Sequence, residues 1–410
     1  MQQRFPLGFW NYVDAADQDA SAVADWDDCG MTLTMSPNYE PGRHDKARFV
    51  AILDEAHRRN IGIILRDNRT GWQGAAADPE GYRARYQAVV EEFGSHPAVV
   101  GIHIGDEPNR DAKDDAMAAL RIAAQVDRTL IPFLNHFPYF PGVEELVGAD
   151  QGYEAYLEDF DSQGDVRLLC YDCYSQMNPG DEGIQRYFTN LRIFSEAAEA
   201  AGIPLWTTLL SVGHFRYRCP SEDDLRWQLY TALASGCKGI LWFYFYMVNV
   251  VNYRLSPIDE HGKRTPTFDS LSRVQKTFLK REGQVMPKLT ATRVAHINRA
   301  YGGYELFLKG QDELLDWVTL TDDLPAIATW YRHEDGSRYF SVVNNSQKES
   351  AQVHIALKGE HALYRQDFGP KEQDLMRGGP GGDSRYTVEK GRTAVDTWLA
   401  PGQMVLYRVE

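Results

Sequence analysis

The sequence is poor in cysteine, in positive charge and in long apolar runs, and each shortage excludes something. Five cysteines in 410 residues are few and odd in number, so we expect no disulfide framework. No apolar run approaches the ~18 residues that a membrane-spanning helix needs. Lysine and arginine number 43 against 58 acidic residues, which gives a net charge of −15. Because this charge would be repelled by nucleic acid and by anionic membranes, we expect neither as a partner.

Several motifs that carry chemistry are also missing. Trp10–Asp14, which follows the first apolar run, is unlike a glycine-rich phosphate turn, and neither a G-x-S-x-G elbow nor a Walker loop occurs. Histidines and carboxylates do not stand at metal-ligand spacing, and the C-x-x-C of Cys170 and Cys173 lacks a second pair. We therefore expect no cofactor and no metal. Because the net charge of −15 disfavours anionic partners, we expect by elimination a neutral ligand.

The N-terminus leaves the compartment open. Residues 1–7 lack the apolar core of a signal peptide. We expect a cytoplasmic protein if Met1 is native, and a secreted or periplasmic one if a signal peptide has been removed. The sequence does not indicate an oligomeric state.

Short apolar runs recur through the first 290 residues, with starts 23 to 38 residues apart. Such gaps hold a helix and a return loop, as a parallel crossover requires, and they are too long for hairpins. The runs are Leu7–Val13, Gly30–Met35, Ile61–Leu65, Val99–Ile104, Leu130–Phe133, Leu168–Tyr171, Ile203–Leu210 and Gly239–Tyr246. The pattern predicts an α/β fold, a (β/α)8 TIM barrel over residues 1–290, with a doubly wound open sheet as the competing fold.

The segments between the runs have helical periodicity. It is clearest in Lys46–Arg59, Asp111–Val126 and Ile184–Ala201. Ser221, with Asp224 three residues later, is a variant of the capping box and predicts a helix start before Leu225–Ser235. After Pro287 the chain changes to short alternating runs, which predict a small antiparallel β-sandwich domain over residues 291–410.

The stretch Val99–Asn109 contains the most distinctive pattern. An apolar strand ends at Gly105 and is followed by Asp106, Glu107 and Pro108. Because Pro108 disfavours the α conformation at Glu107, we expect the two carboxylates to project from a turn. Parallel α/β barrels keep their chemistry at this end of their strands.

The ends of the other predicted strands carry amides, carboxylates and aromatic rings, which a barrel would gather at one rim. Sugar hydroxyls bond planar amides and carboxylates, and the C–H face of a sugar stacks on Trp or Tyr. The expected substrate-binding residues are Trp10, Asn11, Asp67, Asn135, His136, Tyr174, His214 and Tyr244.

Hydrolysis of a glycosidic bond needs a protonated carboxyl for the leaving oxygen and a second group at the oxocarbenium-like centre. Glu107 suits the first task, because an ionised Asp106 beside it would raise its pKa. Asp172, a lone acid after Leu168–Tyr171, is the best candidate for the second, with loop capping as its alternative role. A separation of ~5.5 Å between the two carboxyls predicts retention, and one of ~6.5–9.5 Å predicts inversion.

These residues resemble the motifs of clan A glycoside hydrolases, in particular the barrel-plus-sandwich enzymes related to family 42 β-galactosidases and family 5. The turn Gly105–Pro108 is similar to the fourth-strand turn that carries the acid/base in that clan, and Asp224–Ile240 is similar to the last helix–strand unit. The resemblance implies Glu107 as acid/base. It also implies a nucleophilic Glu at the end of the seventh strand, which Leu205–Arg218 lacks, so Asp172 is the expected substitute.

The segment His103–Glu107 is also similar to the fourth-strand motif of family 20 hexosaminidases, in which the Asp orients the acetamido group of the substrate. The function we expect is hydrolysis of an O-glycosidic bond in a neutral oligosaccharide or glycoside, with Glu107, Asp172 and Asp106 as catalytic residues. Three alternatives stay open: a substrate-assisted N-acetylhexosaminidase using Asp106 and Glu107, a non-catalytic carbohydrate-binding protein on a hydrolase scaffold, and a metal-dependent hydrolase.

Overall fold

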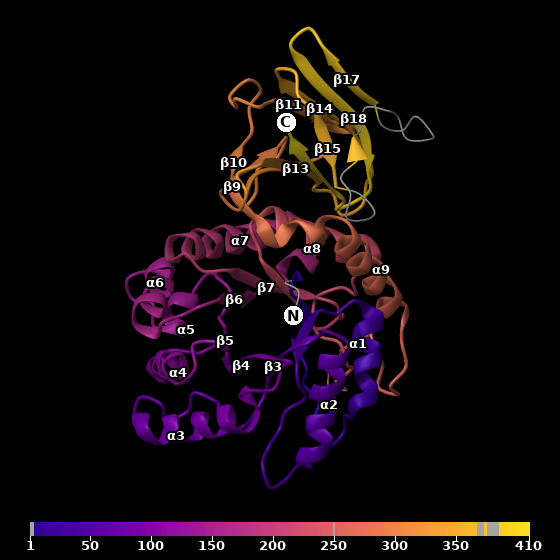
Figure 1. Ribbon diagram of the computed structural model, residues 1–410. Coiled ribbons are helices and arrows are strands. Elements are labelled where there is room, and N and C mark those ends of the chain that lie inside the picture. The colour runs from indigo at the N-terminus through magenta and orange to yellow at the C-terminus, as the bar shows by residue number, and fades with distance from the viewer. Residues whose placement is uncertain (1–3, 249–250, 367–372, 375–384) are drawn as a thin grey trace. The chain divides into compact units, whose positions relative to one another are not determined.

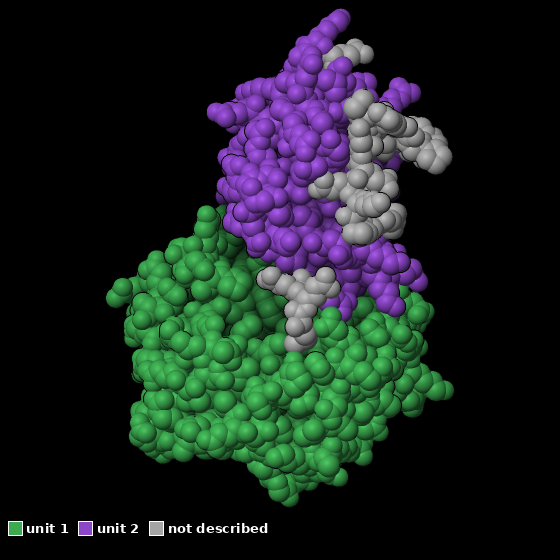
Figure 2. Space-filling view, in the orientation of Figure 1, with its two compact units in different colours: residues 1–2, 6–219, 238–272 green, residues 3–5, 220–237, 273–410 purple. Residues whose placement is uncertain are grey.

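The computed structural model describes residues 4–248, 251–366, 373–374 and 385–410. The chain divides into two compact units, which Figure 2 shows in different colours. Unit 1 contains residues 1–2, 6–219 and 238–272, and unit 2 contains residues 3–5, 220–237 and 273–410. The chain therefore leaves unit 1 and returns to it before entering the C-terminal part of unit 2.

In the described part of unit 1, eight strands form two parallel four-stranded sheets with the orders β1-β8-β7-β6 and β2-β3-β4-β5. The strands are β1 (Leu7–Phe9), β2 (Leu33–Met35), β3 (Gly62–Leu65), β4 (Val99–Asp106), β5 (Ile131–Asn135), β6 (Leu169–Asp172), β7 (Leu205–Leu210) and β8 (Gly239–Phe243). Each apolar run predicted from the sequence overlaps one of these strands, so the prediction of parallel α/β architecture is confirmed.

Backbone hydrogen bonds also connect the two sheets. The Thr32 N–H donates to the Leu7 carbonyl at 2.9 Å, beside β1 and β2. The His136 N–H donates to the Cys170 carbonyl at 2.8 Å, which joins the chain after β5 to β6. Strands that follow one another in the sequence are therefore neighbours in space throughout the described part of unit 1.

Helices alternate with the strands of unit 1 and lie on their outer side (Figure 1). They are α1 (Val23–Cys29), α2 (Lys46–Arg58), α3 (Pro79–Val89), α4 (Lys113–Val126), α5 (Val143–Val147), α6 (Tyr153–Gly164) and α7 (Asp181–Ala201). The amphipathic pattern explains their packing: α2 buries Phe49, Ile52 and Leu53 and starts after Asp45, whose side chain accepts from two backbone N–H groups. Among the described residues, no helix is both long and apolar enough to cross a membrane.

The strands described in unit 2 form two further sheets, with the orders β10-β9-β12-β13-β19-β15-β16 and β11-β14-β18-β17. Paired neighbours are antiparallel, apart from β9 and β10. The strands are β9 (Leu289–Ile297), β10 (Glu305–Leu306), β11 (Leu315–Leu320), β12 (Ala326–His333), β13 (Arg338–Asn344), β14 (Ala351–Lys358), β15 (Leu363–Arg365), β16 (Gln373–Asp374), β17 (Arg385–Glu389), β18 (Arg392–Leu399) and β19 (Met404–Val409). Both sheets contribute to one apolar core, in which Val353 and Ile355 of β14 meet Phe340 and Val342 of β13.

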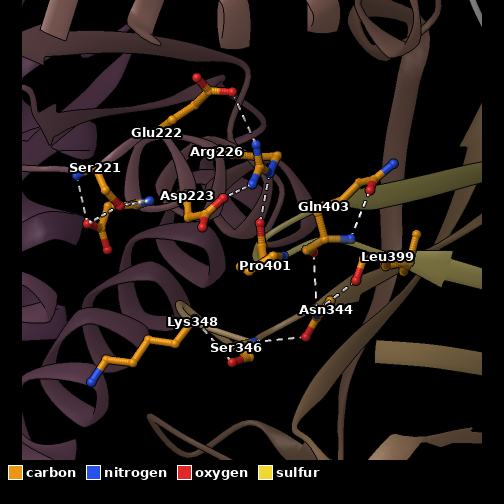
Figure 3. Close-up of polar contacts among 12 residues, drawn as sticks. Ser221, Glu222, Asp223, Arg226, Asn344, Ser346, Lys348, Leu399, Pro401 and Gln403 are labelled. Atoms are coloured by element: carbon orange, nitrogen blue, oxygen red, sulfur yellow. Dashed lines mark hydrogen bonds and ion pairs between the residues drawn. The ribbon is translucent and has the colours of Figure 1, made fainter. Parts of the chain in front are cut away.

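Helix α8 (Glu222–Ala234) belongs to unit 2, whereas α9 (Pro266–Lys280) spans the division between the units. The predicted capping box is present: Ser221 Oγ accepts from the Asp224 N–H at 3.2 Å, and Asp224 Oδ2 accepts from the Ser221 N–H at 2.8 Å. Figure 3 shows how Arg226 of α8 reaches the carbonyl of Pro401, at 2.8 Å from its Nε. The domain limits 1–290 and 291–410 stay predictions.

Candidate active site

The ends of three neighbouring strands place the candidate catalytic residues side by side. Asp106 ends β4 and lies opposite Asn135, which ends β5, in the parallel register. Asp172 ends β6, which the bridge between His136 and Tyr171 joins to the chain after β5. Because parallel strands point the same way, their final side chains meet at one edge of unit 1.

The amide of Asn135 holds two of the carboxyls. Its Nδ2 donates to Asp106 Oδ1 at 3.1 Å and to Asp172 Oδ1 at 2.8 Å. The side chain of Asp172 is also hydrogen-bonded to Glu107 and to Tyr174. The structure therefore brings Asp106, Glu107 and Asp172 together.

The site that Asp106, Glu107 and Asp172 form raises the pKa of two neighbouring carboxyls, Glu107 and Asp172. Burial, the charge of Asp172 and the charge of Asp106 raise the pKa of Glu107, in that order. Burial also raises the pKa of Asp172, but hydrogen bonds from Asn135, Tyr174 and Glu107 lower it. The contact between the two carboxyls acts oppositely on them: it raises the pKa of Glu107 and lowers that of Asp172.

Asp106 differs from this pair because a cation faces it. Burial and then the charge of Asp172 raise the pKa of Asp106 to about 7, while Asn135 and the charge of Arg66 act in the opposite direction. The Arg66 guanidinium lies over the ring of Tyr12, 5.6 Å from the ring centroid. Solvent reaches Asp106, although protein surrounds the site that Asp106, Glu107 and Asp172 form.

An unusual backbone conformation at Glu107 sets the position of its side chain. Glu107 has a φ of 49°, in the left-handed region, and its N–H donates to the Asn135 carbonyl at 2.8 Å. This conformation costs a non-glycine residue ~1–2 kcal/mol. As predicted from Pro108, the chain does not run directly into a helix after β4, since α4 begins at Lys113. At Gly105 an added Cβ would lie 2.1 Å from the Trp72 ring, so the strand end is closely packed.

A pocket of about 300 Å³ opens beside Glu107 and Asp172. Tyr174 and His214 line it, and each stacks on a further ring: Tyr174 on Phe243 with ring centroids 5.3 Å apart, and His214 on Tyr253 at 4.8 Å. The other lining residues are Phe137, Pro138, Phe140, Cys173, Ser175, Arg186, Phe215 and Tyr217. Two carboxyls beside aromatic rings suit a sugar, whose hydroxyls and C–H faces need both kinds of partner.

Four other residues predicted from the sequence have polar atoms engaged within the protein, whereas both ring nitrogens of the buried His136 lack a hydrogen-bond partner among the described residues. Trp10 donates from Nε1 to Thr208 at 3.0 Å. For four others the contacts are as follows: Asn11 Nδ2 donates to Gln18 at 2.8 Å, Asp67 pairs with Arg69 at 2.7 Å, the buried His136 ring packs on Phe160 at 4.8 Å, and the Tyr244 hydroxyl accepts from the Val248 N–H at 3.1 Å. A substrate contact by any of these five residues stays a prediction.

The sequence argument did not select four residues that lie beside the carboxyls or in the pocket. Tyr12 and Arg66 are chain neighbours of the selected Asn11 and Asp67, so the strand-end argument pointed to the segments on which they lie. Arg186 lies within α7, and Tyr217 lies in the loop after β7. A rule restricted to strand ends gives no signal for a helical residue. Within the described ranges, no group of three or more His, Cys, Asp or Glu side chains is arranged to hold a metal ion.

Comparisons with known proteins bear on the fold. No family model matches the chain, and no curated protein matches it. A family 5 glycoside hydrolase from Bacteroides vulgatus is 13% identical, with a TM-score of 0.53 over 98% of this chain and 89% of that chain. A family 39 glycoside hydrolase from Bacteroides cellulosilyticus is 12% identical, with a TM-score of 0.51 over 100% of this chain and 81% of that chain.

A β-galactosidase from the psychrophilic Marinomonas ef1 matches 66% of this chain at 10% identity and a TM-score of 0.48, and the match spans only 59% of that enzyme. The likeness to the family 5 and family 39 enzymes shows the fold. In fold, the chain resembles clan A-like glycoside hydrolases, as its motifs predicted.

Proposed function

We propose that this protein is a glycoside hydrolase whose eight parallel strands close into a (β/α)8 barrel. Closure is supported by the hydrogen bonds that join Leu7 to Thr32 and Cys170 to His136, at the two junctions between the sheets of unit 1. In such a barrel the strand ends that carry Asp106, Asn135 and Asp172 border one rim, which is where parallel barrels hold their active sites. The two-sheet region at residues 291–410 would form the second domain.

The observation that carries the proposal is the hydrogen-bonded carboxyl pair of Glu107 and Asp172 at an aromatic-lined pocket. Glu107 is the proton donor: its raised pKa keeps the proton available at neutral pH for the leaving oxygen. Asp172 meets the oxocarbenium-like centre as a carboxylate, which Asn135 and Tyr174 stabilise by donating to it.

The hydrogen bond between the two carboxyls describes the site without a sugar, whereas retention or inversion depends on the spacing that the carboxyls take around the substrate. Neither retention nor inversion is therefore assigned. A bound sugar must replace this contact, and the proton of Glu107 then turns from Asp172 to the leaving oxygen. Breaking a carboxyl–carboxylate hydrogen bond at that moment frees both groups for the reaction.

The same contact favours a second candidate, a substrate-assisted N-acetylhexosaminidase. While Asp172 is engaged with Glu107, Asp106 also accepts a hydrogen bond from Asn135, and the charge of Arg66 favours its ionised form. In this alternative Asp106 orients an acetamido group and Glu107 is again the acid. The two candidates differ in substrate, because the second requires an N-acetylated sugar.

The test is hydrolysis of aryl glycosides of both anomers by the wild type, by Glu107→Gln and by Glu80→Gln as an exposed control. We expect Glu107→Gln to slow the reaction about 10²–10⁴-fold for poor leaving groups. The loss should shrink for 2,4-dinitrophenyl glycosides, which leave without a proton, and Glu80→Gln should match the wild type. Unchanged rates in Glu107→Gln would contradict the assignment.

N-acetylglucosaminides and glucosides with the same aglycone separate the two candidates. Turnover confined to the acetamido sugars, and lost in Asp106→Asn, supports the substrate-assisted route. If oligosaccharides raise the melting temperature but no glycoside is cleaved, the chain is a binding protein on a hydrolase scaffold.

A further inference from the structure

Arg186 brings a positive charge to the candidate active site. It lies on α7 and lines the same pocket as Glu107 and Asp172. Among the described residues that line this pocket, it is the only lysine or arginine. In a chain with a net charge of −15, a cation at this place is a local feature that overall composition does not reveal.

The ion pair that holds Arg186 within the protein is weak. Its Nη2 lies 3.5 Å from Glu182, one turn earlier on α7, and the Glu182 side chain is 89% exposed. An exposed pair at this distance competes poorly with a ligand for the guanidinium. The Arg186 side chain is itself 38% exposed, so its donors can reach a bound molecule.

Tyr217 adds a second possible donor to the lining of the same pocket. Burial raises the pKa of Tyr217 to about 12, while the charge of Arg186 acts in the opposite direction. The hydroxyl therefore keeps its proton at neutral pH, within the electrostatic reach of the guanidinium. A guanidinium fork beside a phenol is a donor set that matches the oxygens of a carboxylate or sulfate group.

We propose that Arg186, with Tyr217, recognises an anionic substituent on the saccharide, so that the substrate is an acidic sugar rather than a neutral one. The inference rests on the proposed function, because it assigns the substrate of that same pocket. The Asp172 carboxylate would repel an acidic sugar. A cation among the lining residues of the same pocket offsets this repulsion and fixes the orientation of the ring. The expectation of a neutral ligand came from net charge alone, which does not describe a single pocket.

Turnover tests the proposal with matched pairs of 4-nitrophenyl glycosides of both anomers: glucuronide against glucoside, and galacturonide against galactoside. We expect kcat/KM to be at least tenfold higher for the acid of the preferred pair. Arg186→Gln should remove this preference by raising KM for the acid while leaving the neutral partner within twofold. Arg186→Lys should keep part of it, because the charge stays and the fork is lost.

Binding to the Glu107→Gln variant separates this inference from the proposed function, because it needs no turnover. The probes are trigalacturonate and its methyl ester, and a κ-carrageenan tetrasaccharide and its desulfated form. Tighter binding of either anionic member, lost on adding Arg186→Gln, supports the proposal, and the pair that shows it tells carboxylate from sulfate.

Arg192→Gln is the matched control, since Arg192 lies on the same helix and pairs with Glu196 at 2.7 Å outside the pocket lining. It should leave the preference intact. Equal affinity for the charged and uncharged members of every pair would overturn the proposal, and so would an equal loss of preference in Arg192→Gln and Arg186→Gln.

Discussion

At the scale of single residues, enclosing the carboxyls of the candidate site lowers the stability of the fold. Asp106 shows how this cost depends on pH. Its pKa is about 7 in the folded protein and near 3.9 in an unfolded chain. Between these values the folded state binds more protons, so the stability contributed by Asp106 is present at low pH and is lost as the pH rises through about 7.

We therefore expect Asp106→Asn to stabilise the protein at pH 8 and not at pH 4. Because solvent reaches Asp106 and screens part of its charge, the gain should be about 1–2 kcal/mol. Thermal melts of the wild type and the variant at both pH values measure it. The exposed Asp17→Asn serves as control, and a midpoint difference that is the same at pH 4 and pH 8 would argue against the enclosed carboxyl.

The role of Asn135 can be tested through the pH profile of the reaction. Its hydrogen bonds lower the pKa of both Asp106 and Asp172. In Asn135→Ala these carboxyls should hold their protons to higher pH, and the acidic limb of kcat/KM should move up by about one pH unit, as loss of a charge-assisted hydrogen bond implies. A purely structural role would lower the rate equally at every pH, without moving the limb.

The expectation that functional side chains follow the ends of parallel strands selected the three carboxyls and Asn135. Backbone direction alone places a residue at the end of such a strand. This expectation could not choose between neighbours in the loops that follow. Tyr12 and Arg66 lie beside the carboxyls while Asn11 and Asp67 turn to Gln18 and Arg69. That choice depends on loop geometry, which periodicity does not encode.

At the scale of elements, apolar periodicity predicted strand existence better than strand limits. The run Gly30–Met35 contains β2 only from Leu33, because Gly30 is the left-handed cap that ends α1. In unit 2, hydrophobic alternation does not reveal β18, because Thr393 and Thr397 occupy buried positions and Trp398 an exposed one, although the register of β18 with β14 is regular from Arg392 to Leu399. Pairing with β14, and not local hydrophobic alternation, therefore defines β18 as a strand.

The end of β4 offers a prediction at this scale. Gly105→Ala would place a Cβ 2.1 Å from the Trp72 ring, so the strand or the ring must shift. We expect a loss of about 1–3 kcal/mol in stability, as overpacking usually costs, together with reduced turnover because Glu107 is displaced. Urea unfolding and aryl glycoside hydrolysis measure the two effects.

Gly164→Ala is the matched control for this variant. Its Cβ would meet other atoms at 3.5 Å or more, and its position at the end of α6 favours alanine. Adding Trp72→Leu to Gly105→Ala should recover part of the lost stability. Unfolding of Gly105→Ala at the same urea concentration as the wild type would contradict the close packing of Gly105 against Trp72.

At the scale of the whole molecule, the route of the chain makes the two units interdependent. Helix α8 lies in the sequence between β7 and β8 of unit 1, yet it packs within unit 2. Trp227 of α8 is fully buried and donates from Nε1 to Asn345 Oδ1 at 2.8 Å, and Thr329 Oγ1 donates to the Ala234 carbonyl at 2.8 Å. Sequence patterns predicted α8 itself, but they could not show which set of strands it packs against.

This route predicts that the two units unfold together. If unit 2 unfolds, α8 is released, and with it the connection between the adjacent strands β7 and β8. Trp227→Phe leaves a cavity and removes the bond to Asn345, which should cost about 2–3 kcal/mol. In calorimetry we expect one transition, moved as a whole to lower temperature, whereas Trp398→Phe, at a side chain 51% exposed on β18, should barely move it. Two separate transitions in Trp227→Phe, with only one of them displaced, would show that the shared chain does not couple the units.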